Sequence, residues 1–449
     1  MQQWPKPAAK KNYRTRAPFD PVAYCMWILY QLTILIVLLV AGPFLLLRRG
    51  RHYLSSIGGR LGAYHGAVED SPLWIHAVSV GEVAVASTLI RALPKNLPIL
   101  LTTITPTGQD RAIKTLGDRA TIAYLPFDFG FVIEKFLRRF RPRGLVLVEG
   151  DFWPLLLERT AQRELPIVVV NGRISDQSFR RMSRLKPFLG PIFDRVDRFG
   201  MQTSEDSQRL EHLEITSGKI KTLGNLKFDS AMPDPLPEVE ATLTDLADDR
   251  PILIAGSTMP GEEEQVLNAF EGLGGGEVAM LVLAPRHPER WTQVETLIRE
   301  NGLDSIRRSA MDSENDRPAV VLLDTLGELS SLYRIALGVF VGGTLVPTGG
   351  HNPLEAAQHG VAVVVGPSME NFREISQDFQ DQETWRQVDS AAELEQTWRD
   401  WILDPESARV LGEKGRTVVD QKQGALEKTL QFLQPMIYAE SEQEGDPQG

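Results

Sequence analysis

Hydrophobic and polar positions along the chain form two long series of short apolar segments, each followed by a segment of helical pattern. The first series comprises PLWIHAV, PILLTTITPTG, TIAYLPFD, GLVLVEG and PIVVVNGR. The second comprises PILIAGST, VAMLVLAPRHPER, AVVLLDTLGEL, GVFVGGTL and VAVVVGP. Alternation of this kind predicts parallel strands with helices on both faces of a sheet. We therefore expect an α/β protein with two doubly wound domains.

A different pattern precedes both series. Residues 25–47 read CMWILYQLTILIVLLVAGPFLLL and carry no charge. As a helix this run extends roughly 35 Å, which is enough to cross a bilayer, and Tyr24, Trp27 and Tyr30 are typical interfacial aromatics. A cleaved signal peptide is an alternative, although no small-residue cleavage site follows. A buried core helix is disfavoured because the run has no polar face. We expect a transmembrane or anchor helix, whose orientation the basic flanks leave open.

Composition supplies the remaining boundaries. The segment DSAMPDPLPEVEATLTDLADDR is rich in proline and acidic residues, which predicts a linker, and the acidic C-terminus predicts disorder. The expected organisation is a basic segment at 1–24, the anchor helix at 25–47, a first domain at 48–228, a linker at 229–250, a second domain at 251–438 and a tail at 439–449. The single cysteine, Cys25, excludes an internal disulfide and favours a reducing compartment.

The charge of the chain is unevenly distributed. The net charge is -11, but residues 1–230 contain 32 Lys and Arg against 20 Asp and Glu, a net of +12, and the remainder has a net of -23. A basic half beside an apolar segment favours an anionic lipid surface or an anionic acceptor. The alternative is an ordinary solvated surface.

A nucleotide site is predicted in the second series. The stretch VFVGGTLVPTGGHNPLEAAQHG has a strand, two glycine pairs and a helix start with Asn352 as N-cap, Pro353 at the first position and Glu355 in the first turn. A helix start behind glycines can bind an anion, although by itself it is more often a plain strand-turn-helix junction. The turns at GST and DTLGEL and the guanidinium of Arg286, which can bind phosphate bidentately, strengthen the nucleotide interpretation.

Three residues of the first series are candidates for chemistry. Glu82 follows a strand and opens a helix, where a carboxylate can act as a general base or only stabilise the helix dipole. Glu149 ends a strand two residues before Asp151, which is a weak metal signal. Lys227 can neutralise a phosphate or be a plain surface lysine. The chain has no Walker phosphate loop, dinucleotide fingerprint, nucleophile elbow or zinc cluster, so we expect neither a metal nor a cofactor.

Taken together, the motifs resemble those of the 3-deoxy-D-manno-octulosonic acid (Kdo) transferases of Gram-negative bacteria. The matching motifs are HAVSVGEV, LTTITPTG, YLPFD, VNGRIS, GNLKFD, AGST with GEEE, LAPRHPER, DTLGELSSLY, FVGGTLVPTGGHNPLEAA, and GP with NFRE. They occur in the order typical of the family and extend from about Leu73 to Glu374. Each motif is weak alone, but the ordered set is specific.

The resemblance implies a GT-B glycosyltransferase fold of two facing Rossmann-like domains, the first binding the acceptor and the second the donor. The implied reaction transfers Kdo from CMP-Kdo to lipid IVA, a lipid A precursor of lipopolysaccharide core biosynthesis, with inversion and without a metal or other cofactor. The implied location is the cell inner membrane with the catalytic domains facing the cytoplasm, and no nucleic acid partner is expected.

The resemblance also implies roles for individual residues. Glu82 would be the proton acceptor, and Glu149 and Lys227 would stabilise the transition state. The implied CMP contacts are Pro285, Arg286, Leu326, Gly327, Glu328, Asn352, Pro353, Leu354 and Glu355.

The chain departs from the family pattern at two places. Gly150-Asp151 stands where the family usually has threonine and glutamate, and Met259-Pro260 stands where it tends to have histidine and then glutamate. The departures put acceptor geometry and a polar donor contact in question. Two alternatives follow: a GT-B transferase that uses a UDP-sugar and a polyprenyl acceptor, or a membrane-tethered scaffold with weakened catalysis.

Overall fold

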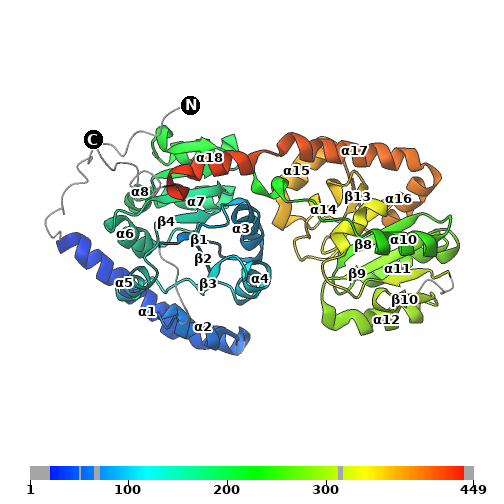
Figure 1. Ribbon diagram of the computed structural model, residues 1–449, viewed down its shortest axis with the longest axis horizontal. Coiled ribbons are helices and arrows are strands. Elements are labelled where there is room, and N and C mark those ends of the chain that lie inside the picture. Colours follow the sequence, from blue (N-terminus) through cyan, green and yellow to red (C-terminus); the bar gives the residue numbers. More distant parts are fainter. Residues whose placement is uncertain (1–20, 50–51, 65–70, 312–316, 439–449) are drawn as a thin grey trace, which may run out of the picture. The chain divides into compact units, whose positions relative to one another are not determined.

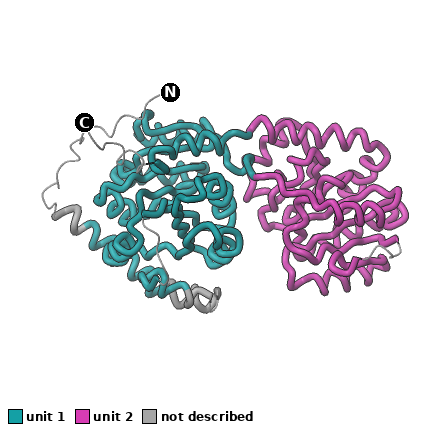
Figure 2. The backbone as a smooth tube through the Cα atoms, viewed as in Figure 1, with its two compact units in different colours: residues 1–230, 423–449 teal, residues 231–422 magenta. Residues whose placement is uncertain are grey.

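The computed structural model describes residues 21–49, 52–64, 71–311 and 317–438 (Figure 1). These residues form two compact units (Figure 2). Unit 1 contains the described residues up to 230 and from 423 onward, and unit 2 contains Ala231–Lys422. The predicted tail at 439–449 and most of the predicted basic segment at 1–24 lie outside the described residues.

Unit 1 is built on a parallel seven-stranded sheet in the order β3-β2-β1-β4-β5-β6-β7. Its strands are β1 (Leu73–His76), β2 (Ile99–Thr103), β3 (Thr121–Tyr124), β4 (Gly144–Val148), β5 (Ile167–Gly172), β6 (Arg198–Met201) and β7 (Ile220–Thr222). In the register of β1 and β2, His76 lies opposite Thr102. All carboxyl ends of a parallel sheet share one edge, which is where such folds place their sites.

Helices cover both faces of this sheet. They are α3 (Val80–Ala92), α4 (Pro106–Leu116), α5 (Gly130–Phe140), α6 (Pro154–Gln162), α7 (Asp176–Arg184), α8 (Lys186–Phe193) and α9 (Ser204–His212), with a 3-10 turn at Leu226–Asp229. Because successive strand residues point to opposite faces, Leu73 and Ile75 enter one core and Trp74 enters the other, against Phe136 of α5.

Unit 2 repeats the architecture with the parallel strand order β10-β11-β9-β8-β12-β13-β14. Its strands are β8 (Ile252–Thr258), β9 (Met280–Pro285), β10 (Ser305–Arg307), β11 (Val320–Leu322), β12 (Gly338–Val341), β13 (Ala362–Val365) and β14 (Arg386–Gln387). Its helices are α10 (Pro237–Ala247), α11 (Glu262–Leu273), α12 (Trp291–Glu300), α13 (Leu329–Leu332), α14 (Leu354–Ala357), α15 (Arg373–Asp381), α16 (Ala391–Leu403) and α17 (Pro405–Lys422). The prediction of two doubly wound α/β sheets is confirmed.

Two boundaries differ from the predicted ones. The segment 229–250, predicted as a linker, contains α10 and belongs to unit 2 from Ala231 onward. The second unit ends at Lys422 and not at 438, because α18 (Ala425–Ile437) belongs to unit 1, as the colours of Figure 2 show. Phe432 and Met436 of α18 lie in a core cluster of unit 1, and Asp229 accepts hydrogen bonds from the amides of Gly424 and Leu426.

The predicted apolar run forms helix α1 (Pro21–Arg49), which α2 (His52–Arg60) follows. The Tyr30 hydroxyl donates to Asp128 Oδ2 at 2.7 Å, and the Gly130 amide donates to Gln31 Oε1 at 3.0 Å, so this part of α1 is bonded to unit 1. Other apolar side chains of α1, including Leu29 and Val40, are 66% and 73% exposed. Within the described ranges, no helix has both the length and the apolar character needed to span a membrane.

Candidate active site

Glu82 lies in the first turn of α3, directly after the carboxyl end of β1. Its Oε2 accepts a hydrogen bond from the Val78 amide at 2.8 Å, and its Oε1 accepts one from the Ser79 hydroxyl at 3.2 Å. Burial raises the pKa of Glu82 to about 7, opposed by these bonds and assisted by the nearby charges of Glu149 and Asp151. The sequence suggested helix-dipole stabilisation as the common role at this position. The pKa of the carboxylate is instead near neutral pH, which suits a general base.

Glu149 and Lys227 lie beside Glu82 in the same unit. Glu149 directly follows β4 with a φ of 62°, and the next residue, Gly150, has a φ of 106°. A left-handed φ is uncommon for a residue other than glycine, and among the described residues Glu164, Glu214 and Glu383 share it. Lys227 Nζ lies 3.7 Å from Glu149 Oε1, so the two charges form an ion pair. The residues predicted separately from three motifs therefore lie together.

An open pocket of about 400 Å³ is shared by Glu82 and Glu149. It is lined by Val78, Glu82, Val148, Glu149, Gly150, Asp151, Arg173, Ser175 and Ser178. Carboxylates from β1–α3 and from the turn after β4 therefore share one cavity with a guanidinium. This arrangement can bind a polar molecule through its guanidinium and hydroxyl groups and remove a proton from it. Among the described residues, no group of three or more His, Cys, Asp or Glu side chains is arranged to hold a metal ion.

Two residues of this site had no assigned role in the sequence analysis. Asp151, noted there as half of a weak metal signal and as a departure from the family pattern, accepts a hydrogen bond from Trp153 Nε1 at 2.6 Å and lines the pocket. His76, at the end of β1, has its Nε2 3.5 Å from Asp151 Oδ2. Their pairing depends on the order of β1 and β4 in the sheet, which sequence spacing does not reveal. The only sequence signal was the histidine that closes the strand in HAVSVGE.

In unit 2, several of the predicted CMP residues influence the pKa values of the same neighbouring side chains. Burial and the charge of Glu355 raise the pKa of the buried Tyr333 hydroxyl, and the positive charge of Arg286 offsets part of this rise. Burial, assisted by the charges of Arg286 and His287, lowers the pKa of His351 to about 4. Asn352 Nδ2 donates to Glu355 Oε1 at 3.2 Å. The Arg286 turn and the GGHNPLE segment therefore lie within electrostatic reach of each other.

The third predicted CMP motif forms an exposed turn. Leu326 is 60% exposed, and Gly327 has a φ of 95° with open space where a side chain would begin. Glu328 accepts hydrogen bonds from Thr325 Oγ1 at 2.6 Å and from Arg308 at 3.1 Å. The predicted turn therefore has a left-handed glycine, and its acid is already paired with an arginine.

The predicted helix start at Asn352 is partly corrected. Helix α14 begins at Leu354 with Pro353 as its N-cap, and it is a single turn that ends at Ala357. Asn352 caps it by accepting a hydrogen bond from the Leu354 amide at 3.2 Å. Because the macrodipole needs several aligned peptide units, one turn contributes little to anion binding. The helix start by itself is therefore a weaker anion site than the sequence suggested.

A buried carboxylate supports the same region. Glu262, at the start of α11, is fully buried and accepts hydrogen bonds from the amides of Met259, Gly343, Thr344 and Leu345 at 2.6 to 2.8 Å. It therefore ties the turn after β8 to the loop after β12. The sequence showed this residue only as part of an acidic helix start, because its partners lie about 80 positions away.

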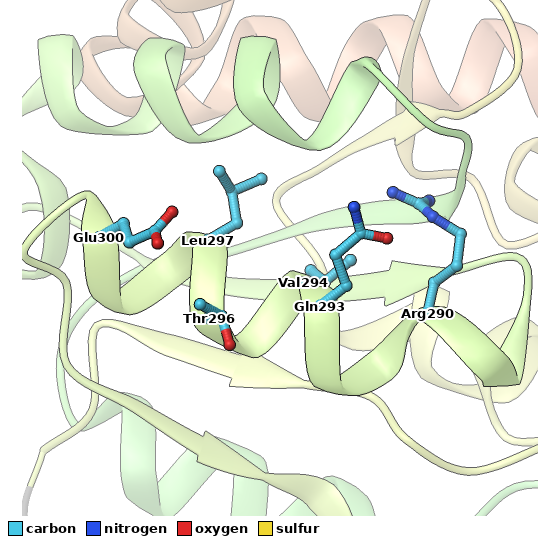
Figure 3. Close-up of a pocket in the computed structure, with 6 residues that line it drawn as sticks. All are labelled: Arg290, Gln293, Val294, Thr296, Leu297 and Glu300. Carbon is cyan, nitrogen blue, oxygen red and sulfur yellow. The ribbon is translucent and has the colours of Figure 1, made fainter.

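A second pocket, of about 380 Å³, lies along α12 and is shown in Figure 3. It is lined by Arg290, Gln293, Val294, Thr296, Leu297 and Glu300. None of the predicted catalytic or CMP residues lines it. The Arg290 guanidinium bonds to the buried Glu263 carboxylate at 2.5 and 3.1 Å, which is a structural role. The Glu82 pocket, and not this one, is lined by residues that were predicted to be catalytic.

The fold defines the class of the protein. Two parallel Rossmann-like sheets of this order are typical of GT-B-like α/β proteins. A UDP-GlcNAc 2-epimerase from Neisseria meningitidis, solved with bound UDP-GlcNAc, aligns with a TM-score of 0.54 over 80% of this chain and 100% of its own, at 12% sequence identity. At that identity the likeness concerns the fold alone.

The family follows from closer relatives. A 3-deoxy-D-manno-octulosonic acid transferase from Haemophilus influenzae is 33% identical over 423 residues, which covers 92% of this chain and 99% of the relative. One from Bordetella pertussis is 33% identical over 398 residues, 84% of this chain and 90% of the relative. The family model of the 3-deoxy-D-manno-octulosonic-acid transferase (kdotransferase) matches residues 55–230. The chain belongs to the 3-deoxy-D-manno-octulosonic acid transferase family and is a glycosyltransferase.

Proposed function

We propose that this chain transfers Kdo from CMP-Kdo to lipid IVA, with inversion at the anomeric carbon and with Glu82 as the general base. The observation that supports this assignment most strongly is the Glu82 carboxylate, which lines an open pocket and has its pKa raised to about 7. A base of that pKa is half ionised near neutral pH and can remove a proton from a sugar hydroxyl.

The chemistry follows from the residues of each unit. Glu82 takes the proton from an acceptor hydroxyl while the hydroxyl oxygen bonds to the anomeric carbon of Kdo. The bond from that carbon to the phosphate oxygen breaks, and CMP leaves with the electron pair. Lys227, paired with Glu149 at 3.7 Å, supplies positive charge near the forming bond. On the donor side, Arg286 meets the charge of the departing phosphate, so we propose that transfer needs no metal and survives chelation with EDTA.

On the donor side, Glu355 is proposed to accept a hydrogen bond from a nucleoside hydroxyl. Its Oε1 is already oriented by the Asn352 amide at 3.2 Å. Glu355→Gln converts one acceptor oxygen into a donor, so we expect CMP to bind about tenfold more weakly, which is the cost of one lost charge-assisted bond. Calorimetric titration of CMP measures this. Unchanged affinity with an intact fold contradicts the assignment.

We also propose that the protein is held at the inner membrane through α1, with its catalytic units in the cytoplasm. Support comes from the exposed apolar side chains of α1, including Leu29, Ile36 and Val40, and from the net charge of +12 in residues 1–230. Exposed apolar patches of this kind are typical of membrane or partner contacts. Accessibility of tagged sites in spheroplasts distinguishes a cytoplasmic from a periplasmic orientation.

Donor choice separates this proposal from its main alternative. Purified full-length protein is incubated with lipid IVA and either CMP-Kdo or a panel of UDP-sugars, and products are identified by mass spectrometry. Transfer from CMP-Kdo alone is expected. Turnover of a UDP-sugar without turnover of CMP-Kdo would mean that the donor assignment is wrong.

A further inference from the structure

A buried histidine lies beneath the Glu82 pocket. His76 is 1% exposed at the carboxyl end of β1. Its Nδ1 lies 3.0 Å from Thr102 Oγ1 and 3.1 Å from the Thr102 carbonyl. Its Nε2 is buried and has no hydrogen-bond partner at normal length, and the nearest acidic oxygen is Asp151 Oδ2 at 3.5 Å. A buried polar atom left without a partner costs free energy, so the position of Nε2 requires an explanation.

The hydrogen bonds around His76 determine where its proton lies. Trp74 Nε1 can only donate, and it donates to Thr102 Oγ1 at 2.8 Å. The Thr102 hydroxyl proton is then available for His76 Nδ1, which leaves the proton of a neutral ring on Nε2. If Nδ1 instead donated to the Thr102 carbonyl in a neutral ring, a bare Nε2 lone pair would face the Asp151 carboxylate, which repels it. The favoured arrangement therefore places an N–H on the side of Asp151.

Asp151 connects this N–H to the pocket. It lines the pocket together with Glu82, and its Oδ2 accepts the 2.6 Å hydrogen bond from Trp153 Nε1. Its charge is one of the influences that raise the pKa of Glu82, after burial and Glu149. Asp151 is therefore held by an indole on one side and faces a buried imidazole N–H on the other.

We propose that His76 is a positioning residue for the transfer reaction: its Nε2–H orients the Asp151 carboxylate beside Glu82. This role rests on the proposed function, because it acts through the base of that reaction. Without the imidazole donor, the partly exposed Asp151 carboxylate is free to turn toward solvent. Its charge then acts less strongly on Glu82. The other charges around Glu82, namely Glu149 with its partner Lys227 and the guanidinium of Arg173, stay in place.

The test compares three variants by the pH dependence of kcat/KM. His76→Phe keeps a ring but has no donor. We expect the acidic limb to move lower by a few tenths of a pH unit, on the order of 0.3 to 0.5, and the plateau to fall about 10- to 100-fold. His76→Gln can still donate toward Asp151, so it should restore most of the limb position. Asp151→Asn should reproduce the shift with the histidine intact. His212→Phe, at an exposed histidine of the same unit, is the matched control.

A merely structural role predicts a different result. If His76→Phe and His76→Gln lose activity equally while the acidic limb stays at its wild-type pH, the positioning role is wrong. If Asp151→Asn shifts the limb and His76→Phe does not, His76 does not act through Asp151. Thermal unfolding of each variant reports whether the fold is retained, and His76→Gln keeps the test valid if His76→Phe does not fold.

A second measurement does not depend on activity. Imidazole nitrogen NMR of the full-length protein, with His76 assigned by its absence in His76→Gln, should show a protonated Nε2 whose resonance moves in Asp151→Asn. A bare Nε2 in the wild-type protein overturns the inference whatever the protein transfers. A protonated Nε2 that responds to Asp151, in a protein that fails to transfer Kdo, would uphold the pairing and refute the proposed function instead.

Discussion

At the scale of single residues, the behaviour of Glu82 depends on a competition between burial and hydrogen bonding. The Val78 amide and the Ser79 hydroxyl favour its ionised form, whereas burial and the charges of Glu149 and Asp151 disfavour it. Burial dominates, and the pKa rises from 4.5 to about 7. A glutamate in an exposed first turn would have an ordinary pKa. Burial in the pocket therefore gives Glu82 the raised pKa that a general base needs.

This environment predicts a pH dependence. The base is active when Glu82 is ionised, so kcat/KM should fall as the pH decreases through about 7, with a slope of one proton. The measurement is a pH–rate profile at subsaturating acceptor concentration. A profile that stays level down to pH 5 contradicts the raised pKa.

The sequence and the structure agree on some residues of this pocket and not on others. Glu82, Glu149 and Lys227 could be assigned roles because their motifs resemble those of a known family. Position alone favoured a helix-dipole role for Glu82 and a surface role for Lys227. His76 and Asp151 could not be paired in advance. Their contact depends on β1 lying next to β4 and on the left-handed turn at Glu149, and neither is encoded in a local pattern.

At the scale of elements, one carboxylate holds together the loops that surround the predicted CMP residues. Glu262 at the start of α11 receives four backbone amides from the turns after β8 and β12. A neutral amide at this position cannot accept all four bonds, and its own NH₂ group would face other donors. The loop that continues into Gly349 and Asn352 therefore depends on a buried charge.

Glu262→Gln should lower the free energy of unfolding of unit 2 by about 2–4 kcal/mol and weaken CMP binding. Calorimetric melting with and without CMP measures both effects. Glu264→Gln, two positions along the same helix and exposed, is the matched control. Equal melting temperatures for the two variants would contradict the role of Glu262.

Element boundaries show where local pattern stops being informative. The strands were predictable because short apolar runs bounded by glycine and proline have few alternatives. Helix α18 was not predictable as part of unit 1, because its apolar face packs against a core formed more than 200 positions earlier, around Leu73 and Val146. Helix α14 is shorter than its well-formed start suggested, since Gly360 ends the segment with a φ of 72°.

At the scale of the whole molecule, the N-terminal half combines a net positive charge with exposed apolar side chains. Residues 1–230 have a net charge of +12, and α1 exposes Leu29, Ile36 and Val40 by 60% or more. At the same time Tyr30 and Gln31 bond to Asp128 and Gly130. The helix therefore presents an apolar surface outward while part of it is bonded to unit 1.

The combined variant Leu29→Ser, Ile36→Ser, Val40→Ser should bind lipid vesicles much more weakly than the wild type, because each buried CH₂ contributes about 0.8 kcal/mol. Flotation with vesicles of phosphatidylethanolamine and phosphatidylglycerol measures the bound fraction. Leu403→Ser, at a side chain of unit 2 that is 78% exposed, is the control. Equal flotation of the triple variant and the wild type contradicts attachment through α1.

The central claim is that this chain transfers Kdo with Glu82 as its base, and one measurement tests it most directly. Wild-type protein and Glu82→Ala are incubated with CMP-Kdo and lipid IVA, and the acceptor mass is recorded over time. The wild type should add the mass of Kdo, and Glu82→Ala should be slower by about 10²- to 10⁴-fold while its melting temperature and CMP affinity are retained. Transfer by Glu82→Ala at the wild-type rate would contradict the claim.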